Sequence, residues 1–87
     1  MTPAEAKLVG RLLHAQSVAK AVTIVVLDSG AECRVYEVAS GQDMHAEFEH
    51  FTTSPAPRGE AKYAEFVYAN EVVRIIDQGT GKVLFAV

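Results

Sequence analysis

Residues 2–27, TPAEAKLVGRLLHAQSVAKAVTIVVL, decide the fold class, because a helical pattern passes directly into a strand pattern there. Thr2 is a favoured helix-capping residue, Pro3 fits the first helical position, and Glu5 completes a capping box three residues after Thr2. Apolar residues then recur at helical spacing: Leu8, Val9, Leu12, Leu13, Ala15 and Ala19. This pattern predicts a helix over residues 3–20.

The segment that follows, residues 21–27 (AVTIVVL), is apolar and β-branched on both faces. Such a run is typical of a central strand that a helix covers on one side. Asp28-Ser29-Gly30 is a turn sequence, and residues 31–39 (AECRVYEVA) predict the returning strand of a hairpin. Residues 40–43 predict another turn, which leads into a third strand over residues 44–52.

Residues 60–69 (EAKYAEFVYA) are open to two interpretations. A helical period places Lys62 and Glu65 on one solvated face and Phe66 on the opposite face, which favours a short helix. The aromatic and β-branched sequence Phe66-Val67-Tyr68 favours a strand. The better fit of the helical period leads us to predict the helix.

The end of the chain predicts a hairpin. Residues 71–77 (EVVRIID) and 82–87 (KVLFAV) are strand-like, and the turn sequence Gln78-Gly79-Thr80-Gly81 separates them. Because residues 84–87 (LFAV) carry no polar group, this last strand has to pair within the sheet or with another molecule.

These elements predict a single α+β domain over residues 1–87. Its N-terminal helix packs on an antiparallel sheet of about five strands, with a short second helix before the C-terminal hairpin. The predicted core brings Leu8, Val9, Leu12 and Leu13 of the helix against Val22, Ile24, Val26, Val35, Phe48, Ile75 and Phe85.

The composition narrows the class of protein. The one cysteine, Cys33, cannot form an internal disulfide or a multi-thiolate metal site, and a small domain without disulfides predicts a cytoplasmic location. Alternation in phase with Val35 predicts that Cys33 is a small buried thiol. The first residues lack the order of a signal peptide, and no apolar run reaches the length of a membrane span.

The charges are distributed unevenly along the chain. Residues 1–20 hold three basic side chains and one acidic side chain, whereas residues 21–87 hold five basic and ten acidic ones. A net charge of −3 argues against general binding to nucleic-acid phosphates. Lys7, Arg11 and His14 lie on the polar side of the predicted helix and form either a surface for an acidic partner or a solvated face.

The strand predicted over residues 44–52 (MHAEFEHFT) carries the polar residues that suggest a site. Strand alternation places His45, Glu47 and Glu49 on one face, with successive residues about 7 Å apart. His and Glu side chains suit zinc, manganese or iron, but His50 points to the opposite face of a regular strand. A solvated sheet face explains the same pattern. Between a chemical site and a surface for a partner, the pattern favours the surface, and we predict that His45, Glu47 and Glu49 bind a partner.

From these features we predict a protein that is not an enzyme and binds neither a metal nor a cofactor. No catalytic motif is present, and the chain is small and acidic with an apolar end. We expect a protein-binding module that forms a homodimer through an exposed strand edge. Phages and other mobile elements often encode small acidic proteins as inhibitors of host machinery, anti-CRISPR proteins among them, and we place this chain in that class as a hypothesis. The alternative is a small metal-binding or enzymatic domain that uses the face of His45, Glu47 and Glu49.

Overall fold

The N-terminal helix forms as its capping signals predict. In this computed structural model, which describes residues 2–41, 50–56 and 65–87, α1 spans Pro3–Val18. The Glu5 amide donates to the Thr2 hydroxyl and the Thr2 amide donates to the Glu5 carboxylate, which completes the capping box. The helix ends two residues earlier than predicted, and Lys20 turns the chain out of it with a φ of 58°.

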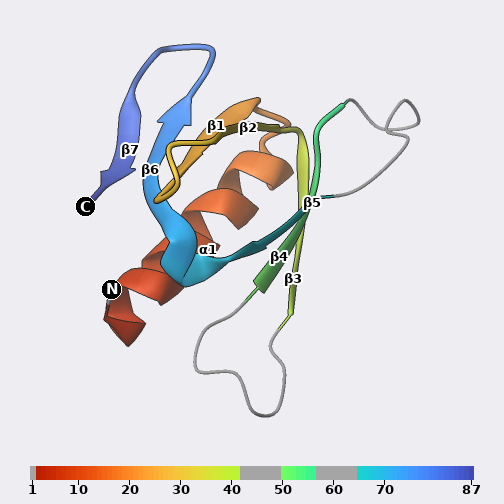
Figure 1. Ribbon diagram of the computed structural model, residues 1–87. Helices are drawn as coiled ribbons and strands as arrows, with labels where there is room; N and C mark the ends of the chain where they lie inside the picture. Colours follow the sequence, from red (N-terminus) through yellow and green to blue (C-terminus); the bar gives the residue numbers. More distant parts are fainter. Residues whose placement is uncertain (1, 42–49, 57–64) are drawn as a thin grey trace.

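Within the described residues, seven strands follow the helix in two antiparallel sheets (Figure 1). The four-stranded sheet has the order β2-β1-β6-β7 and the three-stranded sheet the order β3-β4-β5. The strands and the short 3-10 helix have these bounds: β1 Thr23–Leu27, β2 Glu32–Val35, β3 Glu37–Gly41, β4 His50–Ser54, β5 Glu65–Tyr68, η1 Ala69–Glu71, β6 Val72–Asp77 and β7 Val83–Ala86. The fold class is therefore α+β, with two sheets where the sequence predicted one sheet of about five strands.

The predicted strand over residues 31–39 is divided at Tyr36. Its first part, β2, pairs with β1, and its second part, β3, pairs with β4 in the other sheet. The Tyr36 amide donates to the Ser54 carbonyl at 2.9 Å, so the chain stays paired while it changes sheet. The chain crosses back at η1, between β5 and β6. The predicted turn at residues 40–43 is wrong for Ser40 and Gly41, which belong to β3.

The predicted helix over residues 60–69 is wrong where the structure describes it. Residues 65–68 form β5, which pairs antiparallel with β4, and only Ala69–Glu71 adopt helical geometry as one 3-10 turn. Phe66, Val67 and Tyr68 prefer strands, and β4 offers unpaired main-chain groups beside them. Pairing therefore outweighs the helical period. Residues 60–64 lie outside the described part.

The C-terminal hairpin is confirmed, with β6 paired to β7. Its turn is organised by Asp77, whose side chain accepts the Gly79 amide and the Thr80 hydroxyl at 3.2 and 3.0 Å. Gly81 has a φ of 73°, a conformation that glycine adopts without strain. The turn chemistry that the sequence predicted thus fixes the register of the last two strands.

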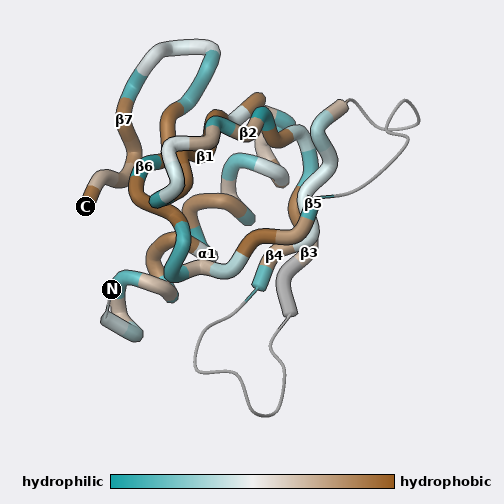
Figure 2. Tube along the Cα trace, viewed as in Figure 1, coloured by the Kyte–Doolittle hydropathy of each residue, from teal (hydrophilic) through white to brown (hydrophobic). Residues whose placement is uncertain are grey.

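The core lies between the two sheets and α1, where the apolar strands and one side of the helix meet (Figure 2). Val9, Leu13, Val35, Ile75 and Phe85 are buried as predicted, and Leu12 packs against them. The other buried apolar residues are Ala6, Val25, Phe51, Val67, Ala69 and Val72.

Four of the predicted core positions in the described residues, Leu12 among them, are only half-buried and one is exposed. In β1, Thr23 and Val25 point inward, so Ile24 and Val26 lie on the outer face and are half-buried, as is Val22 before the strand. Because the sequence AVTIVVL is apolar on both faces, it does not indicate which face of the strand points towards the core. Leu8 is 43% exposed on α1. Phe48 lies outside the described residues.

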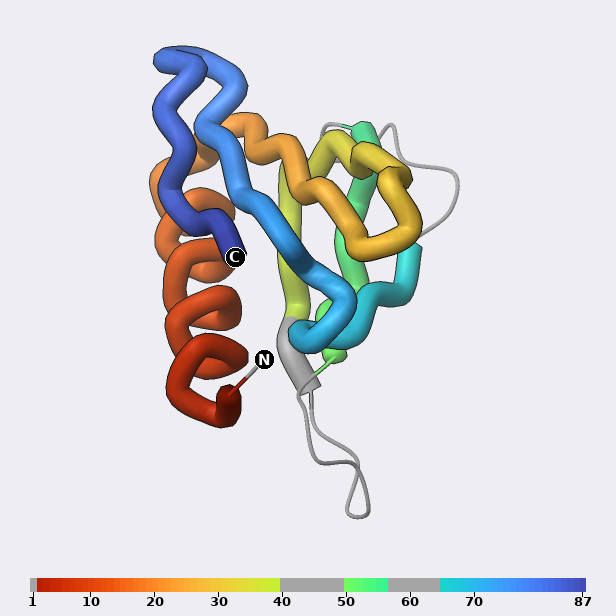
Figure 3. Tube along the Cα trace, turned by 60° about the vertical axis from the view of Figure 1, so that its left-hand side comes forward, coloured from red at the N-terminus to blue at the C-terminus, as the bar shows by residue number. Residues whose placement is uncertain are grey.

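α1 lies along the free edge of the three-stranded sheet (Figure 3). It packs against β3, β6 and η1. The Val38 amide of β3 donates to the Ser17 hydroxyl at 3.4 Å, so the helix satisfies a main-chain group on an edge strand. No helix among the described residues is long and apolar enough to cross a membrane.

Candidate functional site

The outer face of the three-stranded sheet collects aromatic side chains that the core does not use. Phe51, Thr53 and Val67 are buried, so the alternate residues of β4 and β5 point away from the core. The register pairs His50 with Tyr68 and Thr52 with Phe66. We call His50, Phe66 and Tyr68 the aromatic surface.

The three rings of the aromatic surface contact one another. The rings of His50 and Phe66 stack with their centres 4.6 Å apart and their planes 27° apart. Tyr68 meets Phe66 edge to face at 5.0 Å and 84°. Phe66 is nevertheless 54% exposed, which is a large exposed area for a phenyl ring. The rings therefore form a preassembled apolar platform that is open to solvent.

His50 contributes its ring to this platform without a compensating hydrogen bond. Its Nδ1 atom is buried and has no partner among the residues that the structure describes. A buried polar atom without a partner costs on the order of 1–3 kcal/mol. The His50 ring packs against the rings of Phe66 and Tyr68.

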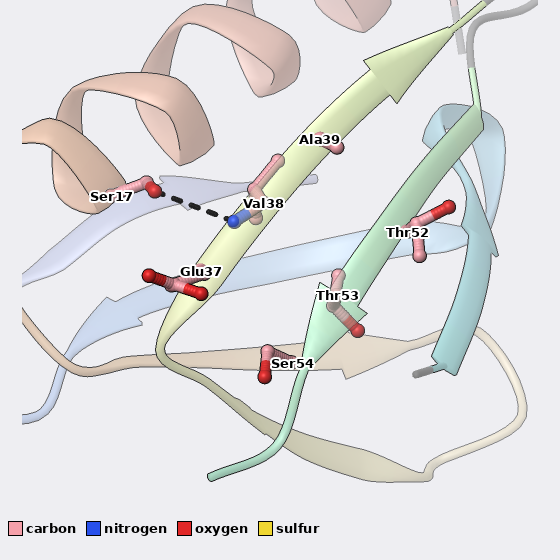
Figure 4. Close-up of a pocket in the computed structure, with 7 residues that line it drawn as sticks. All are labelled: Ser17, Glu37, Val38, Ala39, Thr52, Thr53 and Ser54. Carbon is pink, nitrogen blue, oxygen red and sulfur yellow. Dashed lines mark hydrogen bonds between the residues drawn. The ribbon is translucent and has the colours of Figure 1, made fainter. Parts of the chain in front are cut away.

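A shallow open depression of about 430 Å³ lies over β3 and β4 beside the aromatic surface (Figure 4). Thr52 lines it and is also the cross-strand neighbour of Phe66, so the two features adjoin. Glu37 of β3 and Ser54 of β4 are cross-strand partners at one end of the depression. The lining consists of Ser17, Glu37, Val38, Ala39, Thr52, Thr53 and Ser54.

The hydroxyl groups of Ser17, Thr53 and Ser54 in the depression are engaged in structural hydrogen bonds. Thr53 donates to the Glu65 carbonyl at 3.4 Å, and Ser54 donates to the Ala56 carbonyl at 3.2 Å. Ser17 accepts the Val38 amide. A nucleophilic hydroxyl needs a general base within hydrogen-bond reach, and none of these three bonds joins a hydroxyl to such a base. What the depression offers a ligand is oxygen acceptors, with the exposed carboxylate of Glu37 as its charged group.

Cys33 is half-buried against the core rather than fully buried. Partial burial, together with a hydrogen bond to Glu65 and the negative charge of that residue, raises the pKa of the Cys33 thiol to about 11. A thiol with this pKa is protonated at neutral pH and is a poor nucleophile. This environment agrees with the predicted structural role of Cys33.

The structure describes three of the six residues predicted to bind a partner, and the partner-binding role of all six stays a prediction. Lys7, Arg11 and His14 are exposed on α1, opposite its buried side. His45, Glu47 and Glu49 lie outside the described residues. Within the described ranges, no group of three His, Cys, Asp or Glu side chains is placed to hold a metal ion, and the metal-binding alternative stays a prediction.

The aromatic surface itself was missed from the sequence because residues 60–69 were interpreted as a helix. On a helix, Phe66 and Val67 share an apolar face, whereas on a strand they point to opposite sides of the sheet. The signal that would have found it is the strand preference of Phe66-Val67-Tyr68.

Comparison with known proteins adds no relative to this picture. No protein-family model, curated protein or solved structure matches the chain. The geometry of the site is therefore the basis on which its function has to be inferred.

Proposed function

We propose that this protein is a non-enzymatic module that binds another protein through the outer face of the three-stranded sheet. The observation that carries the proposal is the aromatic surface, in which a 54% exposed phenyl ring is held by two neighbouring rings. Aromatic side chains are enriched in protein interfaces because a rigid ring buries a large area at a small entropic cost.

The adjoining depression supports binding rather than catalysis. Its open shape and hydroxyl lining suit hydrogen bonds to a partner, and the hydroxyl groups of Ser17, Thr53 and Ser54 already serve the fold. The raised pKa of Cys33 likewise argues against a thiol nucleophile.

Three more specific proposals follow from the sequence and are untested. The first is that the module inhibits host machinery for a phage or another mobile element, as anti-CRISPR proteins do, by covering a functional surface. The second is a cytoplasmic location. The third is a homodimer formed through the exposed edge of β7, whose side chains include the half-exposed Val83.

The binding function is tested by comparing variants of two exposed apolar residues. Phe66→Ser removes the centre of the aromatic surface, and Val18→Ser removes a 68% exposed side chain from α1 as a matched control. Each variant is immobilised and exposed to a cell lysate, and captured proteins are quantified by mass spectrometry. We expect a stoichiometric partner that is lost with Phe66→Ser and retained with Val18→Ser. Capture that is the same for all three forms contradicts the proposal.

A further inference from the structure

We propose that the aromatic surface and the adjoining depression together bind an extended protein segment that carries arginine side chains. This inference rests on the proposed protein-binding function and specifies the chemistry of the partner.

The charge of this part of the chain favours a cationic partner. Residues 36–71, which include the whole three-stranded sheet, hold seven acidic and two basic side chains. The remainder holds four acidic and six basic ones. Among the described strands of this sheet, Glu37 and Glu65 are the charged residues and neither Lys nor Arg occurs. The charged side chains on the described strands of this sheet are therefore carboxylates, and the exposed carboxylate of Glu37 attracts a basic ligand.

Rings and oxygen acceptors lie side by side on the same face. Phe66 and Thr52 are opposite each other in the register, and Glu37 lies one strand further across and two residues along the strand. Neighbouring strands are about 4.8 Å apart and alternate residues about 6.8 Å apart, so Phe66 and Glu37 are separated by about 12 Å at their Cα atoms. An extended segment spans this distance in about four residues.

The pairing of rings with a carboxylate suits arginine better than lysine. A guanidinium group is planar, stacks on aromatic faces and donates several hydrogen bonds in one plane. One arginine can therefore lie on Phe66 while a second donates to Glu37 and the Thr52 hydroxyl. The compact, strongly hydrated lysine ammonium loses more hydration and makes no stacking contact. Nucleic acids also stack on aromatic residues, but the exposed carboxylate of Glu37 on the same face repels their phosphates.

The test uses a synthetic peptide of about nine residues, in which two arginines are four positions apart in a glycine–serine background. Binding is followed by NMR titration of the full-length protein. We expect the resonances of Glu37, Thr52 and Phe66 to shift. Replacing both arginines by lysine should weaken binding about fivefold, and replacing them by neutral citrulline should abolish it.

Protein variants locate the binding site. Phe66→Leu keeps an apolar side chain but removes the ring, and Glu37→Gln removes the carboxylate; each should weaken binding about three- to tenfold. Glu32→Gln, at an exposed position on β2 of the other sheet, is the matched charge control and should leave binding unchanged. The amide spectrum of each variant confirms that it is folded.

The outcomes separate the inference from the function on which it rests. Equal binding of the citrulline peptide, equal loss with Glu32→Gln, or stronger binding of a thymidine oligonucleotide would overturn the arginine inference. If the peptide does not bind but protein capture still depends on Phe66, the inference fails and the binding function stands. If neither the peptide nor a captured protein depends on Phe66, both fail.

Discussion

Cys33 shows how burial and a neighbouring carboxylate set the reactivity of a side chain. Its thiol lies half-buried on β2, and the carboxylate of Glu65 on β5 raises its pKa as a hydrogen-bond acceptor and as a negative charge. Burial is the largest cause of the raised pKa, followed by the hydrogen bond and the charge of Glu65. Glu65 belongs to the other sheet, so the pKa of the thiol depends on residues of both sheets.

We therefore expect Cys33 to react slowly with iodoacetamide in the folded protein. The pKa is raised from 9.0 to about 11, so stability from the neutral thiol is complete below pH 9 and is lost as the pH rises towards 11. Glu65→Gln removes the charge and should lower the pKa of the thiol, which accelerates alkylation at pH 8–9. Alkylation rates across pH check this. An unchanged rate profile in Glu65→Gln would show that burial alone sets the pKa.

Phe51 is the residue whose loss should damage the core most. Its side chain is fully buried on β4, on the inner face of the three-stranded sheet. Truncating a buried phenylalanine costs about 3–5 kcal/mol, which is a large part of the stability of a domain of this size. Urea denaturation of Phe51→Ala should show this loss. Phe66→Ala, on the exposed face of β5, is the control and should cost far less; equal losses would contradict the assigned faces of the sheet.

At the scale of elements, local signals in the sequence predict α1 and the last hairpin, whereas the division into two sheets depends on distant contacts. Thr2, Glu5 and Asp77 act within a few residues of their partners, so their sequence patterns are decisive. The bend at Tyr36 is set by pairing with Ser54, which is remote in sequence. The strand at residues 65–68 likewise depends on pairing with β4. The local sequence does not show this pairing, and for that reason it did not predict the aromatic surface.

The capping box makes a prediction for α1. Thr2→Ala removes the acceptor of the Glu5 amide and should destabilise the protein by about 1 kcal/mol in a thermal melt. Hydrogen bonds from Thr2 lower the pKa of Glu5, so its contribution is present above pH 4.5 and is lost as the pH falls through the lowered value. Glu5→Gln keeps the box and should remove this pH dependence. A melt in which Thr2→Ala matches the wild type would argue against the cap.

At the scale of the whole molecule, the two surfaces that we propose for binding, the aromatic surface and the β7 edge, belong to different sheets. The aromatic surface belongs to β4 and β5, whereas β7 is the edge of the other sheet on the opposite side of the molecule (Figure 1). A partner bound at the aromatic surface therefore leaves the β7 edge accessible. A dimer formed through β7 would in turn present two aromatic surfaces and raise the avidity for a repetitive partner.

The β7 edge makes the last prediction, that the protein dimerises in a concentration-dependent manner. Val83 is 50% exposed and Val87 is 79% exposed, and residues 83–87 contain neither a charge nor a proline to block pairing with a second strand. The extra residue Leu84, opposite the register shift in β6, bends this edge, so the association should be weak. Light scattering over a concentration series should show the dimer, and Val83→Lys should suppress it because an edge lysine opposes strand pairing. Val18→Lys on α1 places the same charge away from the edge and should leave the dimer intact, whereas a monomer at every concentration would rule out pairing through β7.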